Sequence, residues 1–89
     1  MHDKLELFLN KVNVPKEYYN FFMGGKILRL KLDHTRRNGI FVIEVEKALP
    51  LEVLSYIDEN IRNGFPDMSM VAAEFVIRNA NYDDASYCF

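Results

Sequence analysis

The sequence has one cysteine, no tryptophan and no long apolar run, and these absences exclude several classes of protein. The single Cys88 excludes an internal disulfide framework and a zinc site built on cysteines. No apolar stretch approaches the ~20 residues that a membrane span requires. The N-terminal segment 1–4 lacks the basic start and apolar core of a signal peptide. We therefore expect a cytoplasmic protein in a reducing compartment, with no membrane partner.

The remaining composition is that of one small globular domain. The chain has 89 residues, of which 49% are hydrophobic and 27% charged, so it can bury a modest core. Its formal net charge of −2 excludes a polycation that coats nucleic acid. We place a single α+β interaction domain at residues 1–78, and interpret 79–89 as a linker or the start of a truncated downstream segment.

Apolar residues recur with helical or strand spacing in six segments, in the order α-α-β-β-α-β. The helical segments are 4–12, 15–23 and 50–63, and the strands are 26–33, 40–46 and 68–78. Pro15 and Pro50 suit the starts of the second and third helices, because their missing N–H is not needed there. Asn38-Gly39 is typical of hairpin turns and is expected to join the first two strands.

This pattern predicts a three-stranded sheet with the helices on one face. The face toward the helices is expected to carry Leu28, Leu30, Leu32, Phe41, Ile43, Val45, Val71, Phe75 and Ile77. The other face mixes apolar and charged residues, so it is a candidate docking surface. We predict a partner-binding set on it that consists of Ile27, Arg29, Lys31, Ile40, Val42, Met70 and Val76.

Charged side chains of the first two strands are expected to meet across the hairpin. Alternation directs Arg29 and Lys31 of the first strand, and Glu44 and Glu46 of the second, to the same face. Cross-strand neighbours of opposite charge attract one another. We therefore expect Arg29 and Lys31 to form ion pairs with Glu44 and Glu46.

No arrangement typical of a catalytic or cofactor site is present. His2 and His34 are far apart in sequence, which disfavours a metal site. No serine follows a glycine elbow with a nearby histidine. Gly24-Gly25 precedes a strand, whereas a phosphate-binding glycine loop precedes a helix. We expect no catalytic residue, no metal and no cofactor in this chain.

Positive charge is concentrated in one predicted strand and its hairpin loop. The candidate DNA-contacting residues are Lys26, Arg29, Lys31, Arg36 and Arg37. Such a hairpin can contact a phosphate backbone. No pair of exposed aromatic side chains accompanies it for base stacking. A charged, solvated edge strand that resists aggregation explains the same residues, so both interpretations stay open.

The order of these elements and three sequence segments resemble a known family. The segments are YYNFFMGGKILRL at 18–30, IFVIEV at 40–45 and ALP at 48–50. They are similar to the N-terminal domain of PolC-type DNA polymerase III, the replicative polymerase of low-GC Gram-positive bacteria. The matching positions are Phe21 or Phe22, Gly25, Lys26, Ile27, Leu30, Phe41, Leu49, Pro50 and Phe65.

The resemblance implies a fold like a type II KH domain or the C-terminal domain of the clamp-loader tau subunit. It also implies that the full-length protein is a DNA-directed DNA polymerase, a nucleotidyltransferase with a 3′–5′ exonuclease, whose activities lie in later domains. This fragment would then be a non-enzymatic docking module for tau or another replisome protein. The alternative is an auxiliary module that binds single-stranded or primed DNA through the basic hairpin. The chain lacks the Gly-x-x-Gly loop with which KH domains clamp nucleic acid.

Overall fold

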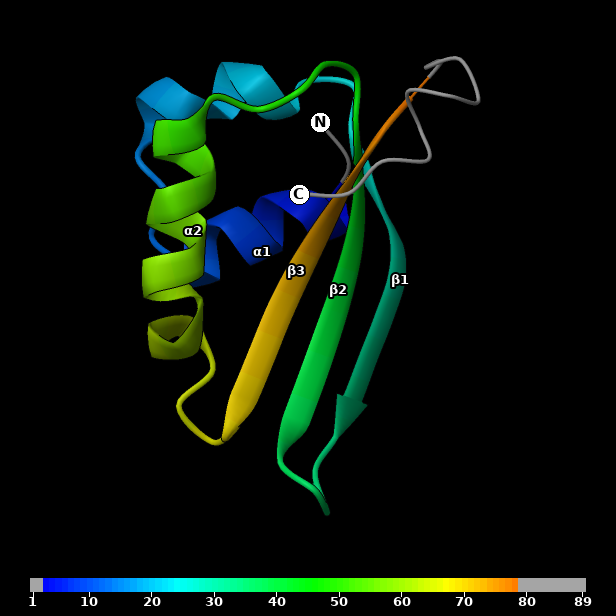
Figure 1. Cartoon of the computed structure of the whole chain (residues 1–89), viewed down its shortest axis with the longest axis vertical. Helices are drawn as coiled ribbons and strands as arrows, with labels where there is room; N and C mark the ends of the chain where they lie inside the picture. Colours follow the sequence, from blue (N-terminus) through cyan, green and yellow to red (C-terminus); the bar gives the residue numbers. More distant parts are fainter. Residues whose placement is uncertain (1–2, 79–89) are drawn as a thin grey trace.

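The computed structural model describes residues 3–78 and contains six elements in the predicted order. They are α1 (Asp3–Lys11), the 3₁₀ helix η1 (Lys16–Phe22), β1 (Lys26–Asp33), β2 (Asn38–Val45), α2 (Leu51–Gly64) and β3 (Met70–Ile77). Figure 1 shows the helices gathered on one side of the strands. None of the described helices has the length and apolar content needed to cross a membrane. The predicted linker, 79–89, lies outside the described residues.

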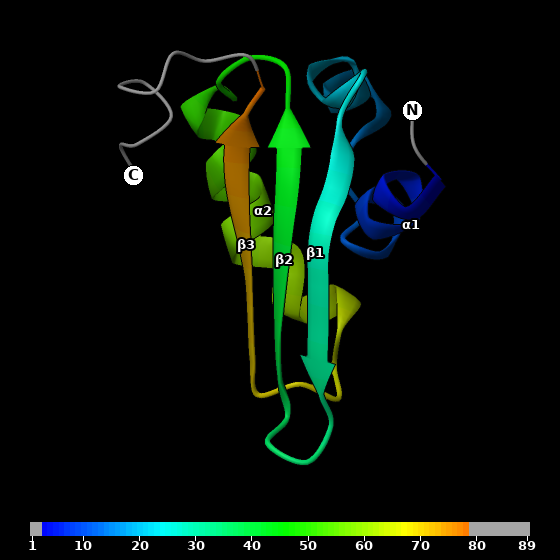
Figure 2. The same ribbon diagram turned by 90° about the vertical axis from the view of Figure 1, so that its right-hand side faces the viewer.

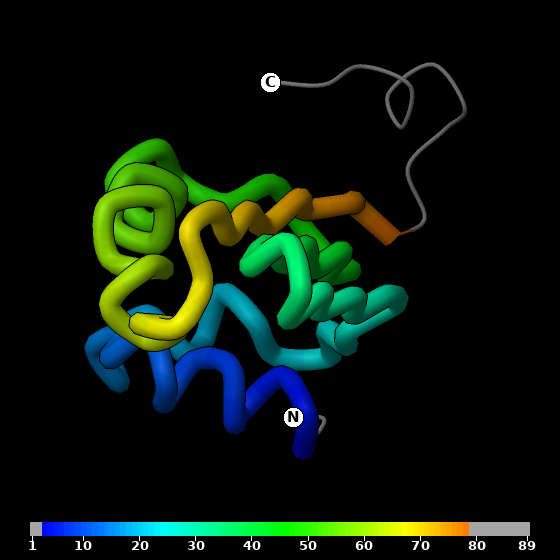
Figure 3. Tube along the Cα trace, turned by 90° about the horizontal axis from the view of Figure 1, so that it is seen from below, coloured from blue at the N-terminus to red at the C-terminus, as the bar shows by residue number. Residues whose placement is uncertain are grey.

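The three strands form one mixed sheet in the order β1-β2-β3. β1 and β2 are antiparallel neighbours joined by a hairpin, whereas β2 and β3 are parallel. Parallel neighbours need a crossover connection, and α2 supplies it. Viewed along the strands, the sheet forms one layer with α1 and α2 on the same side (Figure 3). The predicted α+β architecture is therefore confirmed at this level.

The core lies between this sheet and the helices and is entirely apolar within residues 3–78. α1 contributes its predicted stripe, and Leu5 and Leu9 are fully buried. Three aromatic rings join α1, β2 and the end of α2. Phe8 lies 4.8 Å from Phe41, and Phe41 lies 5.1 Å from Phe65, between ring centroids. These contacts hold both helices on the central strand.

The second helical segment is a 3₁₀ helix, which differs from the α-helix expected at 15–23. With about three residues per turn, side chains three positions apart lie on the same side. Tyr19 and Phe22 therefore pack toward the core, and Phe22 is fully buried. The adjacent Phe21 is 41% exposed. Only one of the two consecutive phenylalanines therefore belongs to the core.

The hairpin loop, predicted at 34–39, is shorter in the structure: residues 34–37 form the turn, and Asn38 and Gly39 already belong to β2. The backbone N–H of Arg36 donates to Asp33 Oδ1 over 3.0 Å, which stabilises the start of the turn. Arg37 has a φ of +59°, and its carbonyl accepts the N–H of Met70 over 3.2 Å. This contact links the end of the turn to the start of β3.

β1 contains a bulge that the alternating pattern did not predict. Ile27 is paired with Ile43 and Arg29 with Val42, so Leu28 is an extra residue between two pairs. The bulge places Ile27 on the same face as the buried Ile43. The prediction that Ile27 lies on the outer face is therefore wrong, and its side chain packs against the core instead.

The leucines of β1 are covered less than predicted. Leu30 is paired with the buried Phe41 on the side of the sheet that carries the helices, yet it remains 47% exposed. Leu32 on the same side is 38% exposed, and the bulge residue Leu28 is 47% exposed. Figure 2 shows α1 beside the upper half of β1, so the lower half extends past it. The helix layer therefore covers β2 and only part of β1.

Candidate interaction surface

The face of the sheet that points away from the helices is the largest candidate for an interaction surface. Strand register assigns to it Lys26, Arg29, Lys31, Asp33, Asn38, Ile40, Val42, Glu44, Met70, Ala72, Glu74 and Val76, which together we call the open face. Figure 2 looks onto this face, with the three strands in front of the helices. A sheet face left uncovered by helices can bind a second protein when its side chains include apolar ones.

The middle of the open face is apolar and its β1 side is basic. Ile40 and Val42 of the central strand are half-buried by their neighbours. Across the sheet, Arg29 is beside Val42 in the register and Lys31 beside Ile40. On β3, Met70 is 71% exposed at one end of the face. A partner would therefore meet a flat apolar strip with positive charge along one border.

The predicted partner-binding set is brought together on this face, with the exception of Ile27. The six residues that share it are Arg29, Lys31, Ile40, Val42, Met70 and Val76. Period-two alternation was sufficient to predict these six, because all of them lie in regularly paired strand. Arg29 is the first regular residue after the bulge. The bulge also moves Lys26 onto the open face, opposite Glu44.

The glutamates at one end of the open face are paired with Arg78, and the predicted pairs with Arg29 and Lys31 are absent from the described residues. Arg78 Nε donates to Glu44 Oε1 over 2.9 Å, and Nη1 donates to Glu46 Oε2 over 3.2 Å. The antiparallel register explains the correction, because Arg29 and Lys31 lie opposite Val42 and Ile40.

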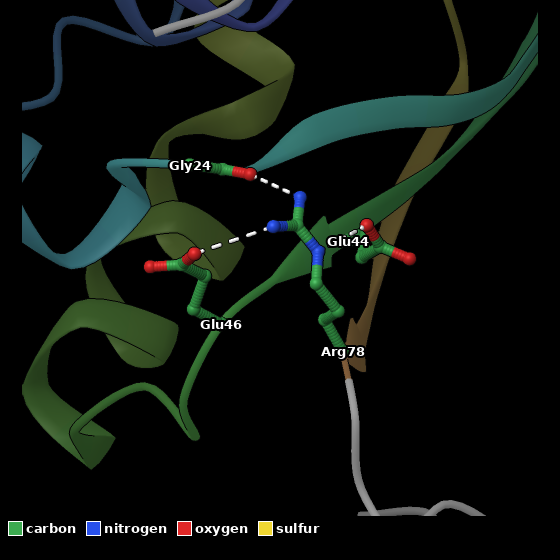
Figure 4. A network of polar contacts seen from close by, with 4 residues as sticks. All are labelled: Gly24, Glu44, Glu46 and Arg78. Carbon is green, nitrogen blue, oxygen red and sulfur yellow. Dashed lines mark hydrogen bonds and ion pairs between the residues drawn. The ribbon is translucent and has the colours of Figure 1, made fainter.

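Arg78 also connects the end of β3 to the turn that precedes β1 (Figure 4). Its Nη2 donates to the carbonyl of Gly24, and its backbone N–H donates to the Val45 carbonyl over 2.7 Å. Gly24 has a φ of +80°, and a Cβ there would lie 2.6 Å from the Glu46 carboxyl group. Sequence reasoning missed this cluster because its cation lies more than 30 residues beyond its carboxylates.

Substitution of Arg78 tests this cluster. Arg78→Gln should lower the free energy of unfolding by about 1–2 kcal/mol, since charge-assisted bonds to partly hydrated groups are lost. The matched control is Arg36→Gln, because Arg36 is 80% exposed and lies 3.9 Å from Asp33. We expect the control to change stability by less than about 0.5 kcal/mol in urea denaturation. Equal effects of both substitutions would show that the contacts of Arg78 contribute no more to stability than those of an exposed arginine.

The residues of the predicted DNA-contacting hairpin do not form one cluster. Arg36 at the turn is paired with Asp33, and Arg37 Nε donates to the carbonyl of Asp67 over 2.9 Å. Lys26 begins β1, about 23 Å of strand away from Asp33 at roughly 3.3 Å per residue. The basic residues therefore spread along β1, and the guanidinium of Arg37 is occupied by the loop before β3.

Other candidate sites are poorly developed in the part of the chain that the structure describes. Residues 3–78 contain no group of three or more His, Cys, Asp or Glu side chains able to hold a metal ion. His34 is an exposed turn residue, as expected, and Cys88 lies outside the described residues. A shallow hollow of about 410 Å³ at the end of α2 is lined by Glu59, Arg62, Asn63, Pro66 and Met68.

Comparison with known proteins identifies the family. A search of curated proteins and a search of solved structures each found no match. A family model described as DNA polymerase III polC-type N-terminus I matches residues 4–75. The match extends from the second residue of α1 into β3 and so covers nearly the whole described fold. The chain therefore belongs to the family of the N-terminus I domain of PolC-type DNA polymerase III.

Proposed function

We propose that this chain is a docking module that attaches a PolC-type replicative polymerase to another protein of the replisome. The open face carries the proposal, because its apolar centre is not covered by any helix of the described fold. Membership of the family places the domain in DNA replication.

The proposed partner is the clamp-loader tau subunit. A type II KH-like fold, similar to the C-terminal domain of tau, forms part of the same proposal. The mixed three-stranded sheet with helices on one face is compatible with that likeness. Because the sequence lacks a Gly-x-x-Gly loop, the likeness concerns the fold and carries no inference of RNA binding.

Titration of the chain with the tau subunit of the same organism tests the proposal. Val42→Glu places a carboxylate in the apolar centre of the open face, beside Arg29, and should weaken binding about tenfold or more, because even a paired carboxylate must lose its water when a partner covers it, at a cost of at least about 1.4 kcal/mol. The control Leu51→Glu alters a 77% exposed leucine at the start of α2 and should leave binding unchanged. Calorimetry measures the affinity, and circular dichroism verifies that both variants fold.

Three results would contradict the proposal. One is the absence of binding of the folded chain to tau and to the other replisome proteins. Another is equal weakening by the two glutamate variants, which would place the contact away from the open face. The third is binding of a single-stranded oligonucleotide with an affinity that falls steeply with salt and is lost in Arg36→Glu, which would favour the alternative DNA-binding function.

A further inference from the structure

The free edge of β1 is a second surface that the fold leaves incomplete. Within the described chain β1 pairs with β2 on one side, and no strand occupies the other. Alternate backbone N–H and C=O groups of an edge strand point outward and can pair with an additional strand. The bulge ends at Arg29, so Arg29–Asp33 offers a regular edge of about 14 Å at roughly 3.4 Å per residue.

On the helix side of the sheet, this edge carries apolar side chains that remain partly exposed to water. Leu30 and Leu32 are 47% and 38% exposed, although their neighbours toward the middle of the sheet include the buried Phe41. Further removal of these leucines from water would be favourable, because apolar surface gains free energy on burial. A strand added beside β1 would place every second side chain next to them. Apolar residues at those positions would complete the layer.

On the open face, the same edge carries the cations Arg29 and Lys31, and Asp33 at its end is paired with Arg36. The ion pairs within residues 3–78 join Arg36 to Asp33, and Arg78 to two glutamates. Arg29 and Lys31 take part in none of them and flank the apolar pair Ile40 and Val42. The intervening side chains of an added strand would lie beside Arg29 and Lys31. Acidic residues at those positions would form the pairs that the sheet lacks.

We propose that the free edge of β1 binds an extended segment of the partner protein in which apolar and acidic residues alternate. The segment adds a fourth strand along Arg29–Asp33, with its apolar side chains beside the leucines and its acidic ones beside Arg29 and Lys31. This inference rests on the proposed docking function and specifies the chemistry of the partner. Such strand addition obtains affinity from backbone hydrogen bonds and specificity from the alternating side chains.

Charge disfavours a second copy of this chain as the occupant. Parallel pairing of β1 with β1 of another copy in register, and antiparallel pairing centred on Leu30, both place Arg29 and Lys31 of the two copies side by side on the open face. Like charges directly opposite one another destabilise a strand pair. A nucleic acid could neutralise the two cations, but it offers nothing that covers Leu30 and Leu32. An acidic and apolar strand satisfies both sides of the edge.

A blocked nine-residue peptide that alternates glutamate with valine is the probe. Titrated into the ¹⁵N-labelled chain at low salt, it should shift amide resonances of Arg29–Asp33 and slow their hydrogen exchange. The matched peptide, with lysine in place of glutamate, should have an affinity at least about tenfold lower. In the double variant Arg29→Glu and Lys31→Glu, the preference should reverse in favour of the lysine peptide. Both side chains are exposed, so we expect the variant to fold.

Backbone pairing is tested with two further glutamate–valine peptides. Each is N-methylated at every second residue, one at the odd positions and the other at the even positions, so that the methyl groups lie along opposite edges of the added strand. One of the two should lose binding, because its methyl groups replace the N–H groups that face β1. Retention of binding by both would show that side chains alone make the contact, and strand addition would be wrong. Absence of any shift at millimolar peptide, a self-association of the chain through β1, or equal shifts with an oligonucleotide would also overturn it.

The two proposals fail separately. Binding of tau that depends on Val42, together with no peptide binding at β1, would leave the docking function standing and refute the edge inference. Conversely, reversal of peptide preference by the Arg29 and Lys31 substitutions, together with no replisome partner, would support the edge as a strand-binding site and refute the docking function.

Discussion

Replacement of Phe22 by alanine should lower the free energy of unfolding by about 3–5 kcal/mol, a value typical of a fully buried phenylalanine. A chain of this length has roughly 4–13 kcal/mol in total, at ~0.05–0.15 kcal/mol per residue. The substitution would therefore remove a large share of the stability. The loss is expected because Phe22 has no exposed surface and lies 6.2 Å from the Phe75 ring of β3, so it anchors η1 to the sheet.

The neighbouring phenylalanine is the control for this prediction. Phe21→Ala removes the same side chain from a position that is 41% exposed and near the Tyr18 ring. We expect a loss of about 1 kcal/mol or less, as for a partly solvated aromatic contact. Guanidinium denaturation followed by circular dichroism measures both variants. Similar losses for Phe21→Ala and Phe22→Ala would contradict the orientation of η1.

Gly25→Ala should cost about 2–3 kcal/mol, because overpacking against rigid neighbours has few means of relaxation. An added Cβ would lie 2.5 Å from the carbonyl oxygen of Glu44 and 3.0 Å from that of Phe22. Both contacts are with backbone, so η1 and β2 would have to move apart. The N–H of Gly25 donates to the Phe22 carbonyl over 2.9 Å, which fixes this approach. Gly25 is therefore required by close packing as well as by the end of the helix.

The same substitution at Gly39 provides the comparison. There an added Cβ would contact Leu32 Cδ2 at 2.6 Å, the end of a flexible, half-exposed side chain. Leu32 can rotate away, so we expect Gly39→Ala to change the free energy of unfolding by less than about 0.5 kcal/mol. Thermal and urea denaturation of the two variants, with the native chain as reference, measures the difference. An equal loss at both glycines would show that local backbone preference, and not packing, determines the effect.

The periodic patterns of the sequence were sufficient to predict the elements and most of the core. The stripe of Leu5, Phe8, Leu9 and Val12 lies at helical spacing and is buried as predicted. The inward positions of β2, among them Phe41 and Ile43, are also confirmed. Local spacing predicts these positions because a helix turn or a strand pair is defined by a few neighbouring residues.

The candidate surface was predicted less completely, for reasons that lie in β1. Alternation over Lys26–Asp33 indicates two regular faces, but the bulge at Leu28 shifts their phase by one residue. Ile27 therefore joins the core, whereas Lys26 joins the open face. The incomplete cover of Leu30 was not predictable either, because it depends on how far α1 extends along the strand.

By itself, the sequence determined the order of elements, the α+β class and the resemblance that the family match confirms, since each rests on local spacing and residue type. Tertiary structure alone decided the bulge, the extent of the hairpin turn and the partners of Glu44 and Glu46. The partners of the glutamates depend on contacts between segments distant in sequence, such as Arg78 with β2. Hydrophobic periodicity predicts which side chains are buried, but it does not predict which charged groups that are distant in sequence form ion pairs.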